Sequence, residues 1–250
     1  MNYEDKNVTK LIYGDNIGRV QLIEAWGSDK TIVNSARVSF GVHKKEIDSR
    51  DEKLIKYLIK HKHTSTLEHC GLTCKFVVPL YVRSQHHRHR TWSYNEISRR
   101  YTDVNIQFYE PQKFRSQHKS NRQASNAEQL FNPEVGDYLY DDKYIFRCLP
   151  CEDEDMNELV SAYHNMSLNM YNMMIEKGVC REQARGVLPQ NMYTEYYGTV
   201  NLNNLIKFIM LRTHEGAQWE IQQVANALIK ISEDLWPITM QAMRDTELIP

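Results

Sequence analysis

The most informative stretch of this chain reads Arg88-His89-Arg90-Thr91-Trp92-Ser93-Tyr94-Asn95-Glu96-Ile97-Ser98-Arg99-Arg100. The wider run from Arg83 to Arg100 holds five arginines, three histidines, one acid and no lysine. The whole chain is nearly neutral, with 31 basic against 32 acidic side chains. Guanidinium groups bind phosphate oxygens bidentately and stack on rings, which a lysine ammonium cannot do. An arginine-only cluster in a neutral chain therefore predicts a site for a nucleotide phosphate.

A solvated basic surface is the ordinary explanation for a run of charge. Two features of this run favour a binding site instead. Trp92, Tyr94 and Ile97 interrupt it with apolar surface, and it follows an apolar stretch that anchors its backbone.

That preceding stretch is predicted to be a strand. Apolar side chains at Leu72, Cys74, Phe76 and Val78 alternate along it, the period of a half-buried strand. Pro79 fits the first position of a following helix, where its missing N–H costs nothing. On that helix Gln85 would share a face with Arg88 or His89, so the arginine loop is expected to leave a rigid strand–helix junction.

Further elements follow from apolar spacing, caps and breakers. The expected elements are a strand at 20–26, a short helix starting at 31–38, an amphipathic helix around 54–59, a methionine-rich helix from Leu159 ending at Gly178, a helix over 202–211 capped by Asn201, and a helix around 221–228 stopped near Pro237. The methionines on the first long helix are expected to fill the core. The polar stretch 116–126 is expected to be a long surface loop.

Composition describes an ordinary globular protein. At 250 residues the chain can bury one sizeable core or two small ones, and 41% hydrophobic with 25% charged residues is typical of soluble domains. No apolar run approaches the ~20 residues that span a bilayer, and the N-terminus lacks an apolar signal segment. Five cysteines do not suggest a disulfide framework. We expect a soluble, cytoplasmic protein.

The pattern R-H-R-x-x-S-x-N-E-x-S-x-R, complete from Arg88 to Arg100, closely resembles the motif of the flavin-dependent thymidylate synthases. Three other blocks resemble the same family, in the same order along the chain. They are His61–His69, Arg181–Pro189, and Leu211-Arg212 followed by Ala217–Ile221. One short motif is weak evidence, whereas four in order are strong.

The resemblance implies a single domain over residues 1–250 with an α+β fold, a twisted antiparallel β-sheet flanked by helices. It implies reductive methylation of dUMP to dTMP, with methylenetetrahydrofolate as one-carbon donor, FAD as hydride relay and NADPH as reductant. It also implies a homotetramer whose active sites are shared between subunits. Neither a G-x-G-x-x-G nor a P-loop motif is present, so the flavin must be held in another way.

The resemblance also implies the site residues. Arg212 is expected to be catalytic, because a guanidinium beside the uracil would stabilise the ring once its N3 proton is lost. The expected dUMP contacts are Gln85, His86, His87, Arg88, Glu96, Ile97, Ser98, Arg99, Arg100, Arg185 and Arg212. The expected FAD contacts are His63, Ser65, Arg88, His89, Arg90, Glu96, Asn201, Leu202, Asn203 and Lys207.

Two positions depart from the family pattern. Gly216 stands where members often carry a histidine before the Ala-Gln pair, with His214 two residues earlier. Lys207 stands where an asparagine or histidine is common. These departures put single flavin contacts in doubt, not the activity.

Several rival hypotheses compete with this interpretation. A metal site at His86, His87 and His89 is disfavoured by the neighbouring arginines, so no metal is expected. A thiol-redox motif at Cys148–Cys151 is disfavoured by the acidic residues after it, which raise a thiol pKa. Ser98 lacks a base and is expected to bind phosphate. A nucleic-acid-binding module using segment 83–101, or a flavoprotein oxidase or reductase that does not methylate, remains an alternative.

Overall fold

The computed structural model describes residues 8–122, 125–134 and 155–250. Contacts between Cα atoms divide the chain into two compact units. The first unit comprises Met1–Val78, Val82–Glu96 and Glu195–Pro250, and the second comprises Pro79–Tyr81 and Ile97–Thr194. Each unit is described by itself below.

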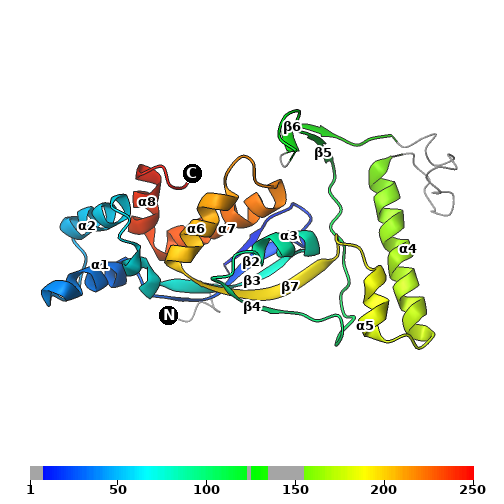
Figure 1. Ribbon diagram of the computed structural model, residues 1–250, viewed down its shortest axis with the longest axis horizontal. Coiled ribbons are helices and arrows are strands. Elements are labelled where there is room, and N and C mark those ends of the chain that lie inside the picture. The colour runs from blue at the N-terminus through cyan, green and yellow to red at the C-terminus, as the bar shows by residue number, and fades with distance from the viewer. Residues whose placement is uncertain (1–7, 123–124, 135–154) are drawn as a thin grey trace. The chain divides into compact units, whose positions relative to one another are not determined.

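The first unit is built on a five-stranded sheet (Figure 1). Its strands lie in the order β1-β2-β3-β7-β4, with bounds β1 Thr9–Leu11, β2 Arg19–Trp26, β3 Gly71–Pro79, β7 Tyr193–Asn201 and β4 Ser93–Glu96. The pairings β1–β2, β2–β3 and β4–β7 are antiparallel. Between β3 and β7, Thr73 bonds Thr199 and Lys75 pairs with Glu195, so these two strands also run in opposite directions.

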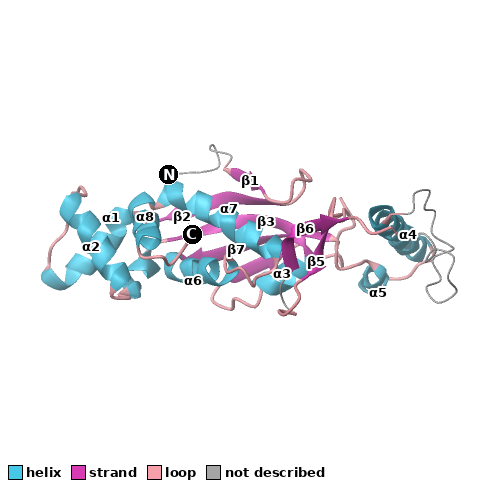
Figure 2. Ribbon diagram, turned by 90° about the horizontal axis from the view of Figure 1, so that it is seen from above, coloured by secondary structure: helices cyan, strands magenta, loops and turns pink. Residues whose placement is uncertain are grey.

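Helices cover one face of this sheet and extend beyond one end of it (Figure 2). They are α1 Asp29–Arg37, α2 Ser49–Lys60, α3 Leu80–His86, α6 Leu202–Arg212, α7 Trp219–Leu235 and α8 Pro237–Asp245. α7 packs on β2 and against α6 and α8. The largest fully buried side chains of this core include Trp236, Tyr196, Phe76 and Phe208.

Local sequence explains where these helices begin. The Asp48 side chain accepts from the backbone N–H groups of Arg50 and Asp51, which caps α2. The Asn201 side chain accepts from Asn204 N at 2.9 Å, which caps α6. Pro237 occupies the first turn of α8, where a missing N–H is tolerated.

The second unit contains a long helix, a short helix and a hairpin. α4 spans Met156–Glu176 and α5 spans Arg181–Ala184, while β5 (Phe114–Gln117) pairs antiparallel with β6 (Ser125–Phe131). Its core cluster comprises Tyr171, Ala184, Leu188 and Met192.

The structure confirms the α+β fold class and most of the expected elements. β2, α1, α2, β3, α4, α6 and α7 all lie where the sequence predicts them, and Asn201 caps α6. The sequence patterns did not predict β1, β4, β7 or α8. No helix within the described ranges is both long and apolar enough to cross a bilayer.

Three local predictions are wrong. Pro79 is the last residue of β3 rather than the first of a helix, because α3 begins at Leu80. The polar stretch 116–126 is not one loop, because its two ends pair as part of the β5–β6 hairpin. The methionines of α4 do not all fill the core, because Met166 and Met170 are 41% and 47% exposed.

Candidate active site

The Arg-His-Arg motif forms a tight turn where α3 ends at His86. The backbone N–H of Arg88 donates to Gln85 O, and that of His89 donates to His86 O. The Tyr94 hydroxyl donates to the His86 carbonyl at 2.8 Å and lies 3.2 Å from the His89 carbonyl. Tyr94 belongs to β4, so the turn is fastened to the sheet.

A glycine makes room for this arrangement. Gly198 lies opposite Tyr94 in the β4–β7 register. A Cβ atom at Gly198 would come within 2.8 Å of the Phe76 ring and 3.3 Å of the Trp92 ring. A side chain there would therefore displace the aromatic residues that support the turn.

His86 lies inside the core of the first unit. Its ring is fully buried and packs against Phe76, Trp92 and Phe208, and its Nδ1 bonds the Tyr196 hydroxyl at 2.8 Å. Burial, with lesser contributions from nearby cationic groups, lowers its pKa well below the usual range, so the ring is neutral. The buried ring of His86 supports the turn, and the dUMP contact expected of this residue stays a prediction.

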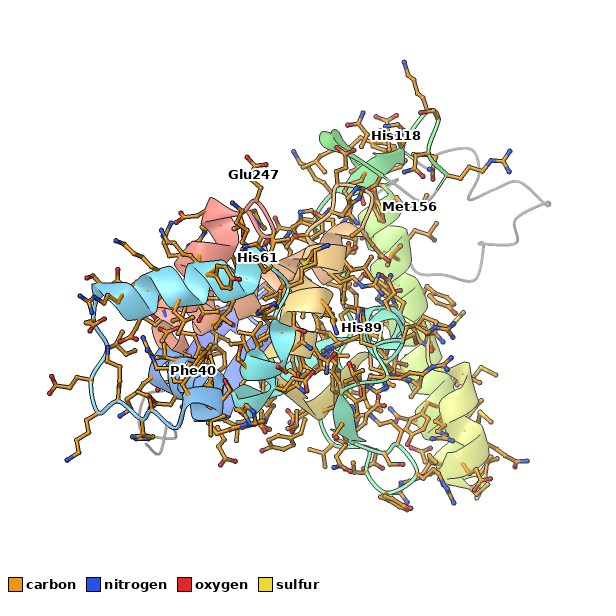
Figure 3. All side chains as sticks on the ribbon, turned by 60° about the vertical axis from the view of Figure 1, so that its left-hand side comes forward. Phe40, His61, His89, His118, Met156 and Glu247 are labelled. Atoms are coloured by element: carbon orange, nitrogen blue, oxygen red, sulfur yellow. The ribbon has the colours of Figure 1, made fainter. Side chains whose placement is uncertain are left out.

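Arg212, the last residue of α6, reaches back to the turn. Its Nε donates to His89 Nε2 at 3.0 Å and its Nη2 donates to Gln85 O at 3.3 Å. His89, labelled in Figure 3, also packs on the Phe208 ring of α6 at 4.8 Å between ring centroids. Burial and the Arg212 charge lower the His89 pKa to about 4, which keeps the ring neutral and able to accept.

A series of hydrogen bonds also connects the start of α7 to the same turn. The Gln85 Nε2 donates to Gln218 Oε1, and the Gln218 Nε2 donates to Glu220 Oε2 at 2.9 Å. Glu220 is 2% exposed. The predicted residues Gln85, His89 and Arg212 are thus brought together, and the sequence did not single out Gln218 or Glu220 as their partners.

Other predicted residues of the first unit surround the turn. Glu96 pairs with Arg83 at 3.2 Å, and both side chains are partly buried. The His87 ring packs on Tyr94 with 4.1 Å between ring centroids, and burial lowers its pKa. Arg88 and Arg90 are exposed.

Five predicted residues, Ile97, Ser98, Arg99, Arg100 and Arg185, lie in the second unit. The Arg100 guanidinium lies 3.5 Å from the Glu182 carboxylate, and Arg185 Nε donates to the Glu182 carbonyl at 3.3 Å. These two arginines, from distant parts of the sequence, therefore meet at one residue. Ser98 Oγ accepts from Arg100 N at 3.3 Å, and Ile97 is half-buried.

Arg99 behaves differently from its neighbours. It is 7% exposed, and its Nη1 donates to Val104 O at 2.7 Å while its Nη2 donates to Asn105 O at 3.4 Å. The guanidinium holds the loop that follows the motif. The dUMP contact expected of Arg99 stays a prediction, and its guanidinium is engaged by these two carbonyls.

A cavity of about 660 Å³ lies in the first unit between α2, α6 and α8. Its floor is aliphatic and includes Ile55, Leu58, Ile59, Leu67 and Ile206. Its polar lining includes Lys60, Lys62, His63, Asn203, Lys207 and Asp245. Among these described lining residues Asp245 is the single acid, and Lys56 pairs with it at 2.6 Å.

Three predicted flavin residues, His63, Asn203 and Lys207, line this cavity. The Asn203 Nδ2 donates to Glu68 Oε1 at 2.8 Å, a contact that the sequence did not reveal. His63 lies with His61 and Tyr57 in an exposed ring cluster, and Figure 3 labels His61 at the end of α2. Ser65 is exposed.

Two other predicted flavin residues have structural tasks. Leu202 is fully buried, and its N–H donates to Cys70 O at 2.7 Å. The flavin contact expected of Leu202 stays a prediction. The side-chain oxygen of Asn201 caps α6. At the departures from the family pattern, exposed His214 accepts from Gly216 N at 3.0 Å, and Lys207 is exposed at the cavity.

The two buried cysteines, Cys70 and Cys74, are not activated. Burial raises the pKa of Cys70 to about 12 and raises that of Cys74 further. Cys148 and Cys151 lie outside the described residues. Within the described ranges, no group of three or more His, Cys, Asp or Glu side chains could hold a metal ion.

Known proteins resemble this chain over most of its length. The family model described as thymidylate synthase complementing protein matches residues 21–238. A flavin-dependent thymidylate synthase of Thermus thermophilus is 38% identical over 228 residues, covering 91% of this chain and 76% of the relative. The enzyme of that name from Thermotoga neapolitana is 37% identical over 225 residues, covering 90% of each.

Solved structures agree with the sequence relatives. The UMP/dUMP methylase PolB of Streptomyces cacaoi, bound with 5-Br dUMP, superposes with a TM-score of 0.75 at 27% identity. The match covers 92% of this chain and 96% of PolB. By sequence and by fold, the chain belongs to the family of flavin-dependent thymidylate synthases.

Proposed function

We propose that the chain catalyses the reductive methylation of dUMP to dTMP, with methylenetetrahydrofolate as the carbon donor and NADPH as the reductant. The observation that carries the proposal is the Arg212 cluster. The guanidinium is fixed by His89 and by the Gln85 carbonyl, and its Nη1 has no partner among the described residues. A fixed donor with an unused N–H is suited to bind a ring oxygen or a ring nitrogen of the nucleotide.

Arg212 acts on the pyrimidine in this proposal. Loss of the N3 proton makes the uracil ring a better nucleophile at C5, and the guanidinium stabilises the negative charge that develops. Because the donor is already oriented, it costs no reorganisation when that charge forms. His89 is neutral and accepts from Arg212 Nε, so it orients the guanidinium without competing for the anion.

The nucleotide phosphate is assigned to exposed arginines. Arg88, Arg100 and Arg185 are all exposed and carry forks that match phosphate oxygens. Gln85, Glu96 and Ser98 contact the sugar or the base. His87 and Ile97 are half-buried and are assigned to the nucleotide as further contacts. Arg99 bonds the backbone of the loop after the motif, and His86 bonds the Tyr196 hydroxyl beneath the turn.

The 660 Å³ cavity fits part of a flavin dinucleotide. Ligand cavities of about 300–1,000 Å³ with apolar walls and a few polar groups are typical of cofactor sites. The aliphatic floor suits a ring system, and Lys60, Lys62 and Lys207 suit phosphates. His63, Asn203 and Lys207 would hold the group here, with Ser65, Arg88, His89, Arg90 and Glu96 as further contacts. When bound, FAD supplies the hydride that completes the methyl group.

We also propose that the two units act as one domain within a homotetramer. One family model runs from residue 21 to residue 238 and so includes parts of both units. The outer face of α4 supports assembly. Its side chains Tyr163, Met166, Met170 and Met173 are 41–51% exposed, and no Asp, Glu, Lys or Arg occurs between Glu158 and Glu176. Such an uncharged surface with large exposed apolar side chains is typical of one that another subunit covers.

Equilibrium binding tests the proposed function before any turnover is measured. The purified protein is expected to show flavin absorbance and to bind dUMP saturably. Protein that retains flavin but does not bind dUMP would contradict the proposal and favour an oxidase or a reductase.

A further inference from the structure

The hydrogen bonds from α7 to the turn have a defined polarity. They begin at Glu220, whose carboxylate oxygen Oε2 accepts a hydrogen bond from the Gln218 side chain. The Gln218 amide must therefore turn its NH₂ group toward Glu220, at 2.9 Å, and its oxygen toward Gln85. The Gln85 amide must in turn direct its NH₂ group toward Gln218.

Gln85 is left with one unused polar atom as a result. Its Oε1 has no partner among the described residues, whereas its NH₂ group is engaged. An amide side chain can otherwise offer either end, because a flip exchanges its donor and its acceptor. Glu220 fixes the orientation of the Gln85 amide indirectly, through the Gln218 side chain that lies between them.

The residue that carries this acceptor is also bonded by a fixed donor, Arg212. Arg212 Nη2 bonds the backbone carbonyl of Gln85 itself, which brings the guanidinium next to this residue. The Arg212 Nη1 is the donor without a described partner, and the Gln85 Oε1 is the matching acceptor. Uracil carries an N3–H donor beside a carbonyl acceptor, which complements this pair when the neutral ring binds, before the N3 proton is lost. A cytosine ring held in the same register would turn an N3 lone pair toward the same acceptor.

We propose that Glu220 and Gln218 are positioning residues that fix the Gln85 amide with its oxygen toward the substrate, so that the site selects a uracil over a cytosine nucleotide. This inference rests on the proposed function, because it takes the nucleotide to bind at Gln85 and Arg212. Glu220 and Gln218 need not touch the substrate, since they act through Gln85.

A carboxylate–amide exchange tests the proposal. Glu220→Gln keeps the shape of the side chain but removes the obligatory acceptor, so both amides can flip. The dUMP and dCMP dissociation constants of the flavin-loaded protein would be measured by calorimetry. An acceptor in the wrong position at a polar recognition site strongly weakens discrimination between related ligands. We therefore expect the preference for dUMP over dCMP to fall by roughly tenfold.

The double variant Gln218→Glu/Glu220→Gln provides the rescue. It restores a carboxylate acceptor at position 218 that faces the Gln85 NH₂ group, and the amide introduced at position 220 can donate to that carboxylate. The preference for dUMP should return to within about threefold of wild type, because the polarity at Gln85 is the same. Glu215→Gln, which removes an exposed carboxylate from the loop before α7, is the matched control and should leave the preference unchanged.

The outcomes separate the two proposals. If wild type binds dUMP selectively and Glu220→Gln retains that selectivity, the positioning role is overturned while the proposed function stands. A double variant that folds with wild-type thermal stability yet stays as unselective as Glu220→Gln would also overturn it. Wild type that does not bind dUMP would refute the proposed function itself.

Discussion

Replacement of Arg212 separates its chemical role from its structural one. In Arg212→Ala the donor facing the pyrimidine is lost, together with the bonds to His89 Nε2 and to the Gln85 carbonyl. Loss of one preorganised donor to a developing anion costs about 3–4 kcal/mol, so turnover should fall roughly a hundredfold to a thousandfold. Flavin occupancy should be largely retained, because Arg212 neither lines the 660 Å³ cavity nor is one of the residues assigned to flavin contact.

The structural cost of the same change is smaller. Two partly exposed hydrogen bonds, each contributing about 1 kcal/mol or less, amount to a loss of about 1–2 kcal/mol. For a chain of this size the Tm should then fall by roughly 2–8 °C. The His89 pKa, now about 4, should rise because the Arg212 cation no longer disfavours protonation, and NMR titration of the ring would detect the change.

Arg212→Lys and Arg244→Ala complete the experiment. Lysine keeps the charge, but its three donors share one nitrogen and lack the planar fork that spans His89, the Gln85 carbonyl and the substrate, so turnover should remain low. Arg244 pairs with Glu233 and is a control for the loss of a partly exposed arginine, which should leave turnover intact. The assay is dTMP formation at saturating substrates. Near-normal turnover in Arg212→Ala would refute the catalytic assignment, and near-normal turnover in Arg212→Lys would refute the argument from the guanidinium fork.

Four further predictions concern other parts of the molecule. Arg88→Ala should lose both flavin absorbance and turnover, and a variant that keeps its flavin would count against the shared role of this residue. Replacement of all five cysteines by serine or alanine should leave turnover measurable, whereas selective loss of turnover in folded, flavin-bound Cys151→Ala would contradict a mechanism without a cysteine nucleophile. The pKa values of His86 and His89 are lowered on folding, so the unfolded chain takes up these protons first. The free energy of unfolding in urea should therefore decrease as the pH falls from about 6.5 toward 4, and a flat profile would count against neutral buried rings. Met170→Glu should lower the molar mass of the assembly measured by light scattering, whereas the exposed control change Lys53→Glu should not. An unchanged molar mass in Met170→Glu would contradict a subunit interface at α4.

Local signals made much of the fold predictable. The cap at Asn201 and the apolar spacing that follows it define α6, and Gly178, with φ of +86°, ends the α4 region as expected. Strand β3 could be recognised because its side chains alternate at the start. Phe76, Val77 and Val78 are all buried, however, because β3 lies in the interior of the sheet.

Non-local pairing limited the remaining predictions. The motif was expected to be a loop, yet residues 93–96 form β4 because they pair with β7, a strand that lies far along the chain. The β5–β6 hairpin lacks apolar alternation at Ser116 and Gln117, so its pairing depends on backbone bonds that composition does not reveal.

The candidate site also depends on contacts between residues that are distant in the sequence. The family resemblance selected Arg99 and His86 as substrate contacts, but burial and hydrogen bonding give both a structural role. Conversely, Gln218 and Glu220 acquire meaning only when α7 brings them to Gln85. A motif identifies which residue types are present, whereas the fold decides which of their atoms remain available.

The central claim is that this chain makes dTMP. The most direct test incubates the purified, FAD-loaded protein with dUMP, methylenetetrahydrofolate and NADPH under anaerobic conditions and measures dTMP by chromatography. We predict dTMP formation that requires all three substrates and is lost when dUMP is omitted. NADPH oxidation without any dTMP, in protein that retains its flavin and binds dUMP, would contradict the account.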